Sequence, residues 1–272
     1  MQKLSTIVFR ALLFAGIAGA VAACGGGGGY GGSGGGGSSY MPPPVQAASS
    51  EGVYVGTASN GTLNGLFIES LVLENGQTYA MYGTQSSTAF FVTGVIEGTG
   101  VTSGTNFSIA NLKDFSSGGA VVSGSLVATV NPGVSLTGTL VEPSGQITFP
   151  GLAPAGSSYV YASAPNLSLI TGAWSGNLLS GGEAVNFTIG TTGSITGLSA
   201  SNCSFTGNLV PRASGKNVFD FNLTYGAAPC ALPNQTATGS VISYLLSNAQ
   251  RQIILAGADA TATHAAVIFA VR

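Results

Sequence analysis

The stretch Leu66–Gly83, with the sequence LFIESLVLENGQTYAMYG, holds two short runs of apolar and β-branched residues around a turn signal. The runs Leu66–Leu73 and Gln77–Gly83 mix aromatic, aliphatic and small polar residues, as β-strands do. The dipeptide Asn75-Gly76 between them favours a two-residue hairpin turn, because Asn and Gly tolerate positive φ. The stretch therefore predicts an antiparallel β-hairpin.

Runs of the same kind continue from Glu51 to the end of the chain, separated by Gly, Asn, Ser and Pro, and no helical period persists for ten residues. The first eight expected strands are Val53–Thr57, Leu66–Leu73, Gln77–Gly83, Ala89–Glu97, Asn106–Leu112, Ala120–Thr129, Ser135–Val141 and Gln146–Phe149. The second eight are Thr171–Asn177, Ala184–Gly190, Ser194–Ser199, Cys203–Val210, Asn217–Tyr225, Ala237–Leu245, Gln252–Ala258 and Ala265–Val271.

The two halves also match in sequence. The segment Gly52–Gly56 (GVYVG) aligns with Gly172–Gly176 (GAWSG), so that both halves open on a G-x-[WY]-x-G strand. Two further pairs align: Phe91–Gly94 (FVTG) with Ser204–Gly207 (SFTG), and Phe107–Ile109 (FSI) with Phe219–Phe221 (FDF). These matches indicate an internal duplication of about 110 residues. The alternative is that glycine-rich β-sequences resemble one another without a common origin.

Eight strands in about 100 residues suit an up-and-down barrel filled by its own side chains. A closed barrel also has no exposed edge strands, which matters for a chain with few charges to protect them. We therefore predict an all-β fold with two tandem antiparallel meander barrels of about eight strands each. The expected domains are residues 51–151 and 169–272, joined by a linker at 152–168.

Residues 1–23 have the features of an export signal. Lys3 and Arg10 precede an uncharged apolar segment, Ala11–Ala23, that is too short to span a bilayer. The ending Val21–Cys24 (VAAC) resembles a bacterial lipobox, which implies that Cys24 is acylated and becomes the first mature residue. Gly25 after the cysteine resembles outer-membrane rather than inner-membrane sorting. The alternative is an ordinary secretory signal with a chance cysteine.

Residues 24–50 follow as a Gly-, Ser- and Pro-rich segment that cannot bury apolar surface. We expect it to be a disordered tether between the acyl chains in the membrane and the folded body. The whole chain contains only 6% charged residues and has a net charge of −2. Ordinary soluble domains contain about a quarter charged residues. Such a chain has no basic patch, which excludes nucleic acid as a partner class.

The chain has three cysteines. If Cys24 carries the lipid, Cys203 and Cys230 remain as a pair in a compartment that permits disulfides. They lie at the open end of a predicted hairpin, where a bridge would close a loop of about 28 residues. A metal or redox site is the alternative, but no His or Cys stands at ligand spacing from them.

No catalytic constellation is evident, and we predict that the protein is not an enzyme and needs no cofactor or metal. The chain has one histidine, His264, which could serve a serine nucleophile only with an acid such as Asp259. No pair of carboxylates can be assigned to glycoside hydrolysis from the sequence. A lone histidine beside a strand is more often a surface residue than a ligand.

Four residues are candidate ligand contacts. Arg212 and Lys216 lie in one predicted hairpin tip and could bind an anionic group, or one of them could pair with Asp220 and order the turn. Tyr54 and Trp174 hold equivalent places in the two halves, where an aromatic ring either plugs the barrel end or stacks on a ligand. For both pairs the structural interpretation is the stronger one.

The lipobox, the tether, the tandem G-x-[WY]-x-G openings and the cysteine hairpin together resemble outer-membrane lipoproteins of proteobacteria. The barrel architecture expected for residues 51–272 is loosely similar to that of surface lipoproteins such as the transferrin-binding protein B family. The charged loops of those receptors are missing here, so the resemblance implies architecture rather than ligand. We expect a non-enzymatic outer-membrane lipoprotein that contacts a glycan or protein, or else a carrier of a small apolar ligand.

Overall fold

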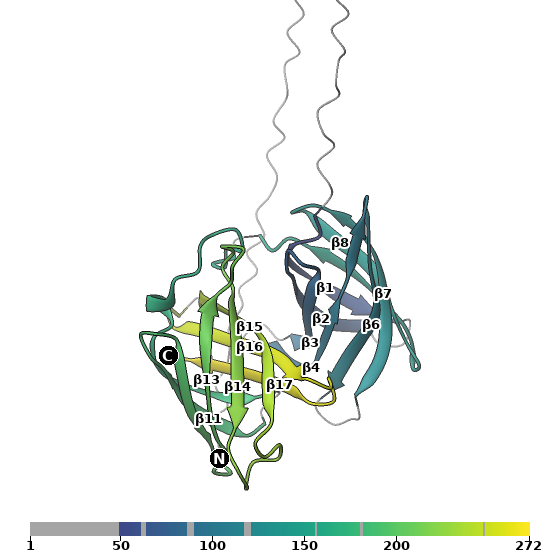
Figure 1. Cartoon of the computed structure of the whole chain (residues 1–272). Coiled ribbons are helices and arrows are strands. Elements are labelled where there is room, and N and C mark those ends of the chain that lie inside the picture. Colours follow the sequence, from purple (N-terminus) through teal and green to yellow (C-terminus); the bar gives the residue numbers. More distant parts are fainter. Residues whose placement is uncertain are drawn as a thin grey trace, which may run out of the picture.

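The computed structural model describes residues 49–272, apart from 61–63, 86–89, 117–120, 156, 180–181 and 247. The predicted signal peptide, Cys24 and the tether as far as residue 48 lie outside the described residues. The described chain forms two closed antiparallel barrels that lie side by side, blue to teal and green to yellow in Figure 1. The predicted all-β fold of two tandem barrels is thereby confirmed.

The first barrel is a meander in which each strand pairs with the next, except that β4 and the short β5 both pair with β6. Its strands are β1 (Gly52–Ser59), β2 (Asn64–Val72), β3 (Gln77–Gln85), β4 (Phe90–Thr99), β5 (Val101–Ser103), β6 (Asn106–Ser116), β7 (Val122–Asn131), β8 (Ser135–Glu142) and β9 (Gly145–Leu152). β9 pairs with β1, and β4 pairs with β6, which together close the wall. The three residues of β5 follow β4 after Gly100 and extend the pairing with β6.

The second barrel has the same topology without the short extra strand. Its strands are β10 (Gly172–Leu178), β11 (Ala184–Ile189), β12 (Ser194–Ser199), β13 (Ser204–Pro211), β14 (Phe219–Tyr225), β15 (Thr236–Leu245), β16 (Arg251–Asp259) and β17 (Ala265–Val271). A short 3₁₀ helix, η1 (Leu167–Leu169), precedes β10. β17 pairs with β10 and closes the barrel.

All sixteen predicted strands are present, with ends shifted by a few residues. The separate strand β5 was not predicted. It arises at Gly100, where an added Cβ would lie within 2.4 Å of the Phe107 ring, so the wall is interrupted to make room for that ring. The three sequence matches between the halves fall on equivalent strands, namely β1 with β10, β4 with β13 and β6 with β14.

The hairpin predicted over Leu66–Gly83 is present as β2 and β3. Its turn is one residue longer than the Asn75-Gly76 signal suggests. The Leu73 amide donates to the Gln77 carbonyl at 2.8 Å, which leaves Glu74, Asn75 and Gly76 as a three-residue loop. Gly76 has a φ of +81°, as the left-handed position of such a loop requires. The Asn75 side chain accepts from the Gln77 amide at 3.0 Å and fixes the turn.

Large side chains fill both barrel interiors. The first core contains Tyr54 and Phe107, and the second contains Trp174 together with several phenylalanines. Tyr54 and Trp174 are each 1% exposed. The Tyr54 hydroxyl donates to the Ser50 carbonyl at 3.1 Å, and the Trp174 indole donates to the Ile170 carbonyl at 2.8 Å. Each ring therefore donates a hydrogen bond to the carbonyl four residues before it. An aromatic side chain held in this way closes the same end of each barrel.

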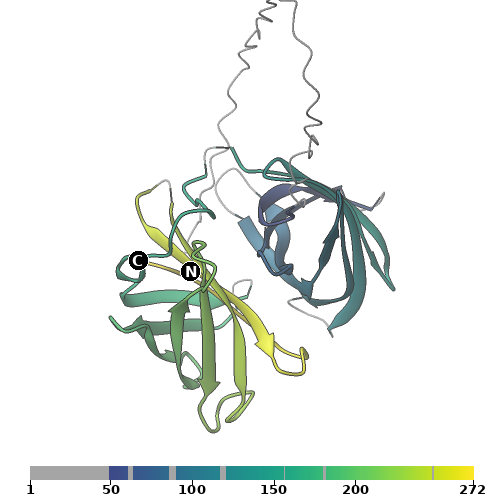
Figure 2. The ribbon, with the colours of Figure 1, turned by 45° about the horizontal axis from the view of Figure 1, so that its top comes forward.

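The barrels meet through outer faces of their walls. Outward side chains of β2, β3 and β4 pack against those of β15, β16 and β17, with Tyr159 of the connecting segment between them. Figure 2 shows the yellow strands of the second barrel facing the blue strands of the first. Residues Gln252–Asp259 of β16 are buried on both faces of the strand, one toward its own barrel and one toward the neighbour. The junction is therefore a third hydrophobic core.

Candidate functional site

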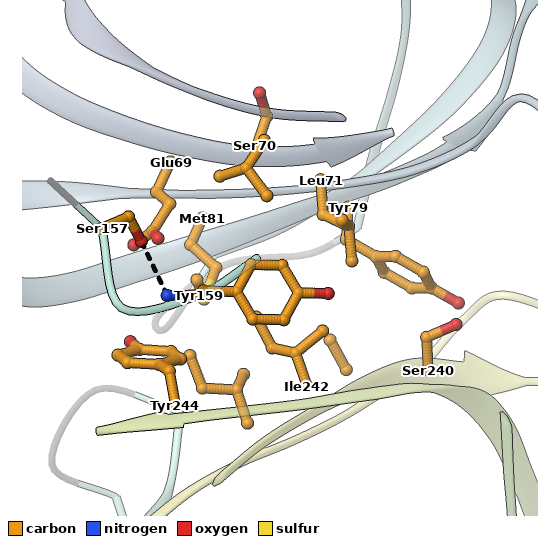
Figure 3. Close-up of a pocket in the computed structure, with 13 residues that line it drawn as sticks. Glu69, Ser70, Leu71, Tyr79, Met81, Ser157, Tyr159, Ser240, Ile242 and Tyr244 are labelled. Carbon is orange, nitrogen blue, oxygen red and sulfur yellow. Dashed lines mark hydrogen bonds between the residues drawn. The ribbon is translucent and has the colours of Figure 1, made fainter. Parts of the chain in front are cut away.

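The junction encloses a cavity of about 40 Å³ between the two walls. Figure 3 shows Tyr159 in the middle of it, with Glu69 above and Tyr244 and Ile242 below. A volume of this size holds a few water molecules rather than an organic ligand. Its walls are mainly apolar side chains from both barrels, so its main effect is to join them.

Glu69 is the one carboxylate that lines this cavity. It projects from the outer face of β2, between Val55 of β1 and Met81 of β3 in the strand register. Burial raises the pKa of Glu69 from 4.5 to about 7. Burial, and then the charge of Glu69, raises the pKa of Tyr244 opposite. The junction therefore holds a carboxyl that titrates near neutral pH.

Charged side chains join the barrels at the rim of the junction. The Arg212 Nε donates to Glu74 Oε1 of the first barrel at 2.7 Å, and its Nη1 pairs with Asp220 of its own hairpin. The Lys216 Nζ lies 3.2 Å from Glu51 Oε1 of the first barrel. The Tyr161 hydroxyl of the connecting segment donates to Glu74 Oε2 at 3.0 Å. We call these six residues the rim cluster.

The rim cluster shows where the structure places the predicted cations. Arg212 does pair with Asp220, which was the structural interpretation of this hairpin tip. Partial burial lowers the pKa of Arg212, but the bonds and charges of Glu74 and Asp220 outweigh burial and raise it overall. The contacts of Arg212 and Lys216 with the first barrel were not foreseen, because Glu74 and Glu51 are more than 130 residues away. Their role as ligand contacts stays a prediction, as it does for the buried Tyr54 and Trp174.

A larger groove opens beside the junction, with a volume of about 410 Å³. Its floor is the outer wall of the first barrel at β4 and β6, and Ala262 of the β16–β17 turn overhangs it from the second barrel. The lining residues are Glu97, Gly98, Thr99, Ala110, Asn111, Lys113 and Ala262. No local sequence pattern marks this groove, because its two walls come from different barrels.

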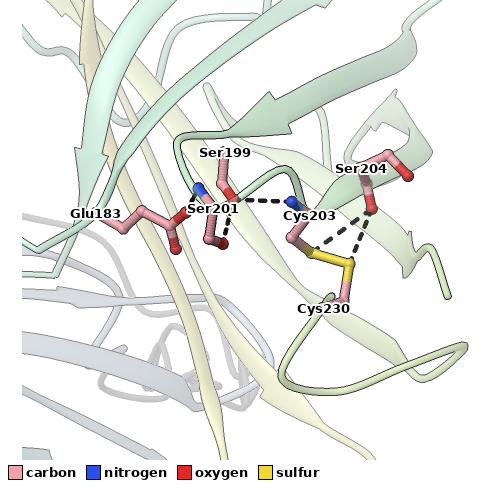
Figure 4. Close-up of a disulfide and its surroundings, with 6 residues drawn as sticks. All are labelled: Glu183, Ser199, Ser201, Cys203, Ser204 and Cys230. Carbon is pink, nitrogen blue, oxygen red and sulfur yellow. Dashed lines mark hydrogen bonds between the residues drawn. A yellow bond between two sulfur atoms is a disulfide. The ribbon is translucent and has the colours of Figure 1, made fainter. Parts of the chain in front are cut away.

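The predicted disulfide between Cys203 and Cys230 is confirmed (Figure 4). Cys203 directly precedes β13, and Cys230 lies in the loop after β14, so the bridge ties the open end of this hairpin. The Cys203 amide donates to the Ser199 hydroxyl at 3.2 Å, which links the bridge to the end of β12. The bridge is thus a structural element of the second barrel wall.

His264 and Asp259 lie close together, as a catalytic pair would need. The contacts of Asp259, however, are with residues of the β16–β17 turn that holds both side chains. Asp259 accepts from the Thr263 and His264 amides at 2.8 and 3.0 Å and from two threonine hydroxyls. Burial opposes its charge, but these bonds outweigh burial and lower the pKa of Asp259. Its Oδ2 lies 3.4 Å from the His264 Nδ1. The arrangement orders the β16–β17 turn.

Two acids of the first barrel, Asp114 and Glu142, lie close together in its interior. The sequence did not predict this pair. The Tyr82 hydroxyl donates to both oxygens of Asp114, at 2.7 and 2.9 Å. Burial raises the pKa of Asp114, and burial followed by the Asp114 charge raises the pKa of Glu142. An added Cβ at Gly94 or Gly124 would meet the Tyr82 or Glu142 side chain within 3.0 Å. Asp114 lay beyond the predicted end of its strand, so its inward position could not be read.

The described residues also lack two other features, a metal-binding cluster and a membrane-spanning helix. No group of three or more His, Cys, Asp or Glu in this part of the chain is arranged to hold a metal ion. No helix within the same residues has the length and apolar character needed to cross a bilayer.

No protein-family model and no curated protein sequence matches the chain. Among solved structures, it is similar to the isotype 1 transferrin-binding protein B of serogroup B Neisseria meningitidis, with 13% identity, a TM-score of 0.28, and coverage of 79% of this chain and 67% of that one. A mutant transferrin-binding protein B of Haemophilus parasuis Hp5 has 11% identity, a TM-score of 0.27 and coverage of 81% and 63%. A DUF3598 protein of unknown function from Nostoc punctiforme has 11% identity, a TM-score of 0.26 and coverage of 82% and 95%. The chain thus spans about two thirds of the transferrin-binding proteins and nearly all of the third.

Proposed function

We propose that the protein is an outer-membrane lipoprotein, held by acyl chains on Cys24, whose two-barrel body has a non-enzymatic binding or envelope-structural role. Its partner would be a glycan or another protein of the envelope. The N-terminal sequence supports the anchor, since an apolar segment ends in VAAC before a Gly- and Ser-rich stretch. The two barrels supply the folded body that would present the binding surface.

The observation that carries the proposed binding role is the uncharged character of the exposed walls, which present hydroxyl and amide groups beside some aliphatic side chains such as Val127 and Val210. Every Lys and Arg in the described residues contacts a partner within the chain: Lys113, Arg212, Lys216, Arg251 and Arg272. The strand register also aligns five exposed threonines in one row across the free wall of the second barrel: Thr188, Thr196, Thr206, Thr224 and Thr236. A partner of this surface would meet hydroxyl and amide groups rather than charges.

The carrier of a small apolar ligand is the weaker alternative. Such a carrier needs small residues facing inward to leave a cavity. Here the barrel axes are occupied by large side chains such as Tyr54, Phe107, Trp174 and Phe187. The cavity and groove described above both lie outside the barrel cores. The packing therefore favours recognition on the outer surface.

The anchor is tested by metabolic labelling with radioactive palmitate. We expect the full chain to be labelled and the Cys24→Ala variant to be unlabelled and released from the membrane fraction. Cys203→Ala is the matched control, because it removes a cysteine from the folded body and should keep its label. Labelling of Cys24→Ala, or its retention in the membrane, would contradict the proposed anchor.

The binding role is tested with a photo-reactive amino acid placed at single exposed positions in living cells. Thr206 of the second barrel and Thr137 of the first are suitable, because their side chains face outward and are exposed. We expect a discrete cross-linked product from at least one wall, and protease treatment of intact cells would show which side of the membrane it faces. Failure to cross-link from either wall would contradict a binding role for these surfaces.

A further inference from the structure

The groove beside the junction has the dimensions and the chemistry of a small-ligand site. Its volume of about 410 Å³ falls within the range of pockets that hold small organic ligands. It lies between two rigid barrels, and sites between domains are common places for ligands. The groove shares no lining residue with the small apolar cavity at the centre of the junction, so the two are distinct sites.

A β-bulge shapes the floor of the groove. The register of β6 against β7 shifts between Ile109 and Leu112, so two consecutive residues, Ala110 and Asn111, both face outward. Bulges of this kind re-aim side chains and occur often next to functional sites. Here the bulge adds the Asn111 amide to the groove, beside Gly98 of β4, which presents bare backbone.

The charged residues of the groove are arranged so that one carboxylate faces it without an ion pair. Glu97 and Lys113 are register partners on β4 and β6. None of the ion pairs in the described residues joins them, because the Lys113 Nζ turns to the Ser123 hydroxyl at 2.8 Å. Burial raises the pKa of Glu97 to about 7, against a smaller opposing effect of a hydrogen bond from Gln77. Above pH 7 the ionised Glu97 has one hydrogen bond from Gln77 and no ion pair, so its carboxylate keeps acceptor capacity toward a ligand.

We propose that this groove binds one or two sugar residues of a neutral glycan. The inference rests on the proposed binding function and names its ligand class and site. Glu97 supplies carboxylate acceptors, Asn111 supplies an amide that donates and accepts, and Thr99 supplies a hydroxyl. Vicinal sugar hydroxyls match such a set, since each donates and accepts. Above pH 7, where Glu97 is ionised, it would repel an anionic ligand, and an apolar ligand would leave these polar groups unpaired.

The test uses the full chain, purified in detergent, labelled with ¹⁵N and titrated with cellotetraose, chitotetraose and maltotetraose at millimolar concentration. We expect at least one sugar to shift the amide resonances of Gly98, Thr99, Asn111 and Ala262 together. Glu97→Gln and Asn111→Ala should each weaken that binding by about tenfold or more, as loss of a hydrogen bond to a charged or amide group does. Thr206→Ala on the opposite wall is the matched control and should bind normally.

The spectra of each variant also report whether it is folded, so loss of binding cannot be confused with unfolding. Binding that shifts only residues of the threonine row would overturn the groove as the site but leave the proposed binding function standing. No shift with any of the three sugars would overturn the neutral-glycan assignment, and the cross-linking experiment would decide the binding function by itself. Equal binding by Glu97→Gln, Asn111→Ala and the wild type would also overturn the assignment.

Discussion

The substitution Glu69→Gln should stabilise the protein at alkaline pH and leave it almost unchanged in acid. Glu69 lines the apolar junction cavity, and none of the ion pairs in the described residues includes it. Its pKa is raised from 4.5 to about 7 by burial. The folded protein therefore holds this proton more tightly than the unfolded chain does. The ionised form destabilises the fold above pH 7, and this effect is lost as the pH falls toward 4.5.

The size of the effect follows from that pKa. A change from 4.5 to about 7 corresponds to about 3.4 kcal/mol at pH 8 and about 0.8 kcal/mol at pH 5, since each pKa unit is worth about 1.36 kcal/mol. Glu69 is only half-buried, and solvent screens part of its charge. We therefore expect Glu69→Gln to gain about 1 to 2 kcal/mol at pH 8. For a domain of about this size, that is a rise of roughly 2 to 8 °C in Tm.

Thermal unfolding followed by circular dichroism at pH 8 and pH 5 measures this difference. Glu74→Gln is the matched control, because its carboxylate lies in the rim cluster. Partial burial opposes its charge, but hydrogen bonds from Arg212 and Tyr161 outweigh burial and lower the pKa of Glu74. Its charge thus stabilises the fold above its unfolded pKa, and Glu74→Gln should lower Tm at pH 8. An exposed pair of this kind contributes about 0.5 to 1 kcal/mol.

A lower Tm of Glu69→Gln than of the wild type at pH 8 would contradict this prediction, since the Glu69 carboxylate would then have a stabilising partner. An equal gain at pH 8 and pH 5 would also refute it, because the benefit would not come from removing a charge. If both variants change Tm in the same direction at pH 8, the assignment of Glu69 as a half-buried carboxylate without an ion pair, and of Glu74 as an ion-paired one, is wrong.

Three further predictions concern the barrel walls and cores. Cys203→Ser should lower the stability of the second barrel by about 3 kcal/mol through loss of the loop constraint, and dithiothreitol should lower the Tm of the wild type but not of this variant. Trp174→Ala should cost about 3 to 5 kcal/mol in urea denaturation, whereas Tyr54→Phe should cost only about 1 kcal/mol for its lost hydroxyl bond. Gly94→Ala should destabilise by about 1 to 3 kcal/mol, because the new methyl would meet Tyr82; the same stability as the wild type would show that the ring moves aside.

The strands were predictable because each is a local pattern of alternating residues between Gly, Asn and Pro turns. The disulfide was predictable for the same reason, since Cys203 and Cys230 flank one hairpin. The turn at Gly76 was predicted one residue too short, because the Asn-Gly signal does not fix where pairing resumes. The strand β5 was missed because the interruption at Gly100 depends on the Phe107 ring on the neighbouring strand.

The candidate sites were less predictable. The continuous apolar run of β16 (IILAGA, residues 253–258) is consistent with a strand buried on both faces, and this signal could have located the junction. Nothing local marks Glu69, Glu97 or Asn111, since each is an ordinary outward residue of a strand. Their surroundings come from the other barrel, and the bulge at Ala110 appears only when β6 pairs with β7.

Local sequence patterns were enough to predict the strands, the two tandem barrels and the disulfide hairpin. The VAAC ending at Cys24 is likewise a local signal, and the lipid anchor that we propose rests on it. These depend on residues close together in the chain, whose period and turn chemistry act locally. Which walls of the barrels meet and which stay exposed became evident from the packing of the two barrels against each other. The same packing also decided that Arg212 and Lys216 pair with Glu74 and Glu51, and where the groove opens. Those features depend on packing between surfaces that are more than 100 residues apart, where burial sets the partners and the charge state of each group.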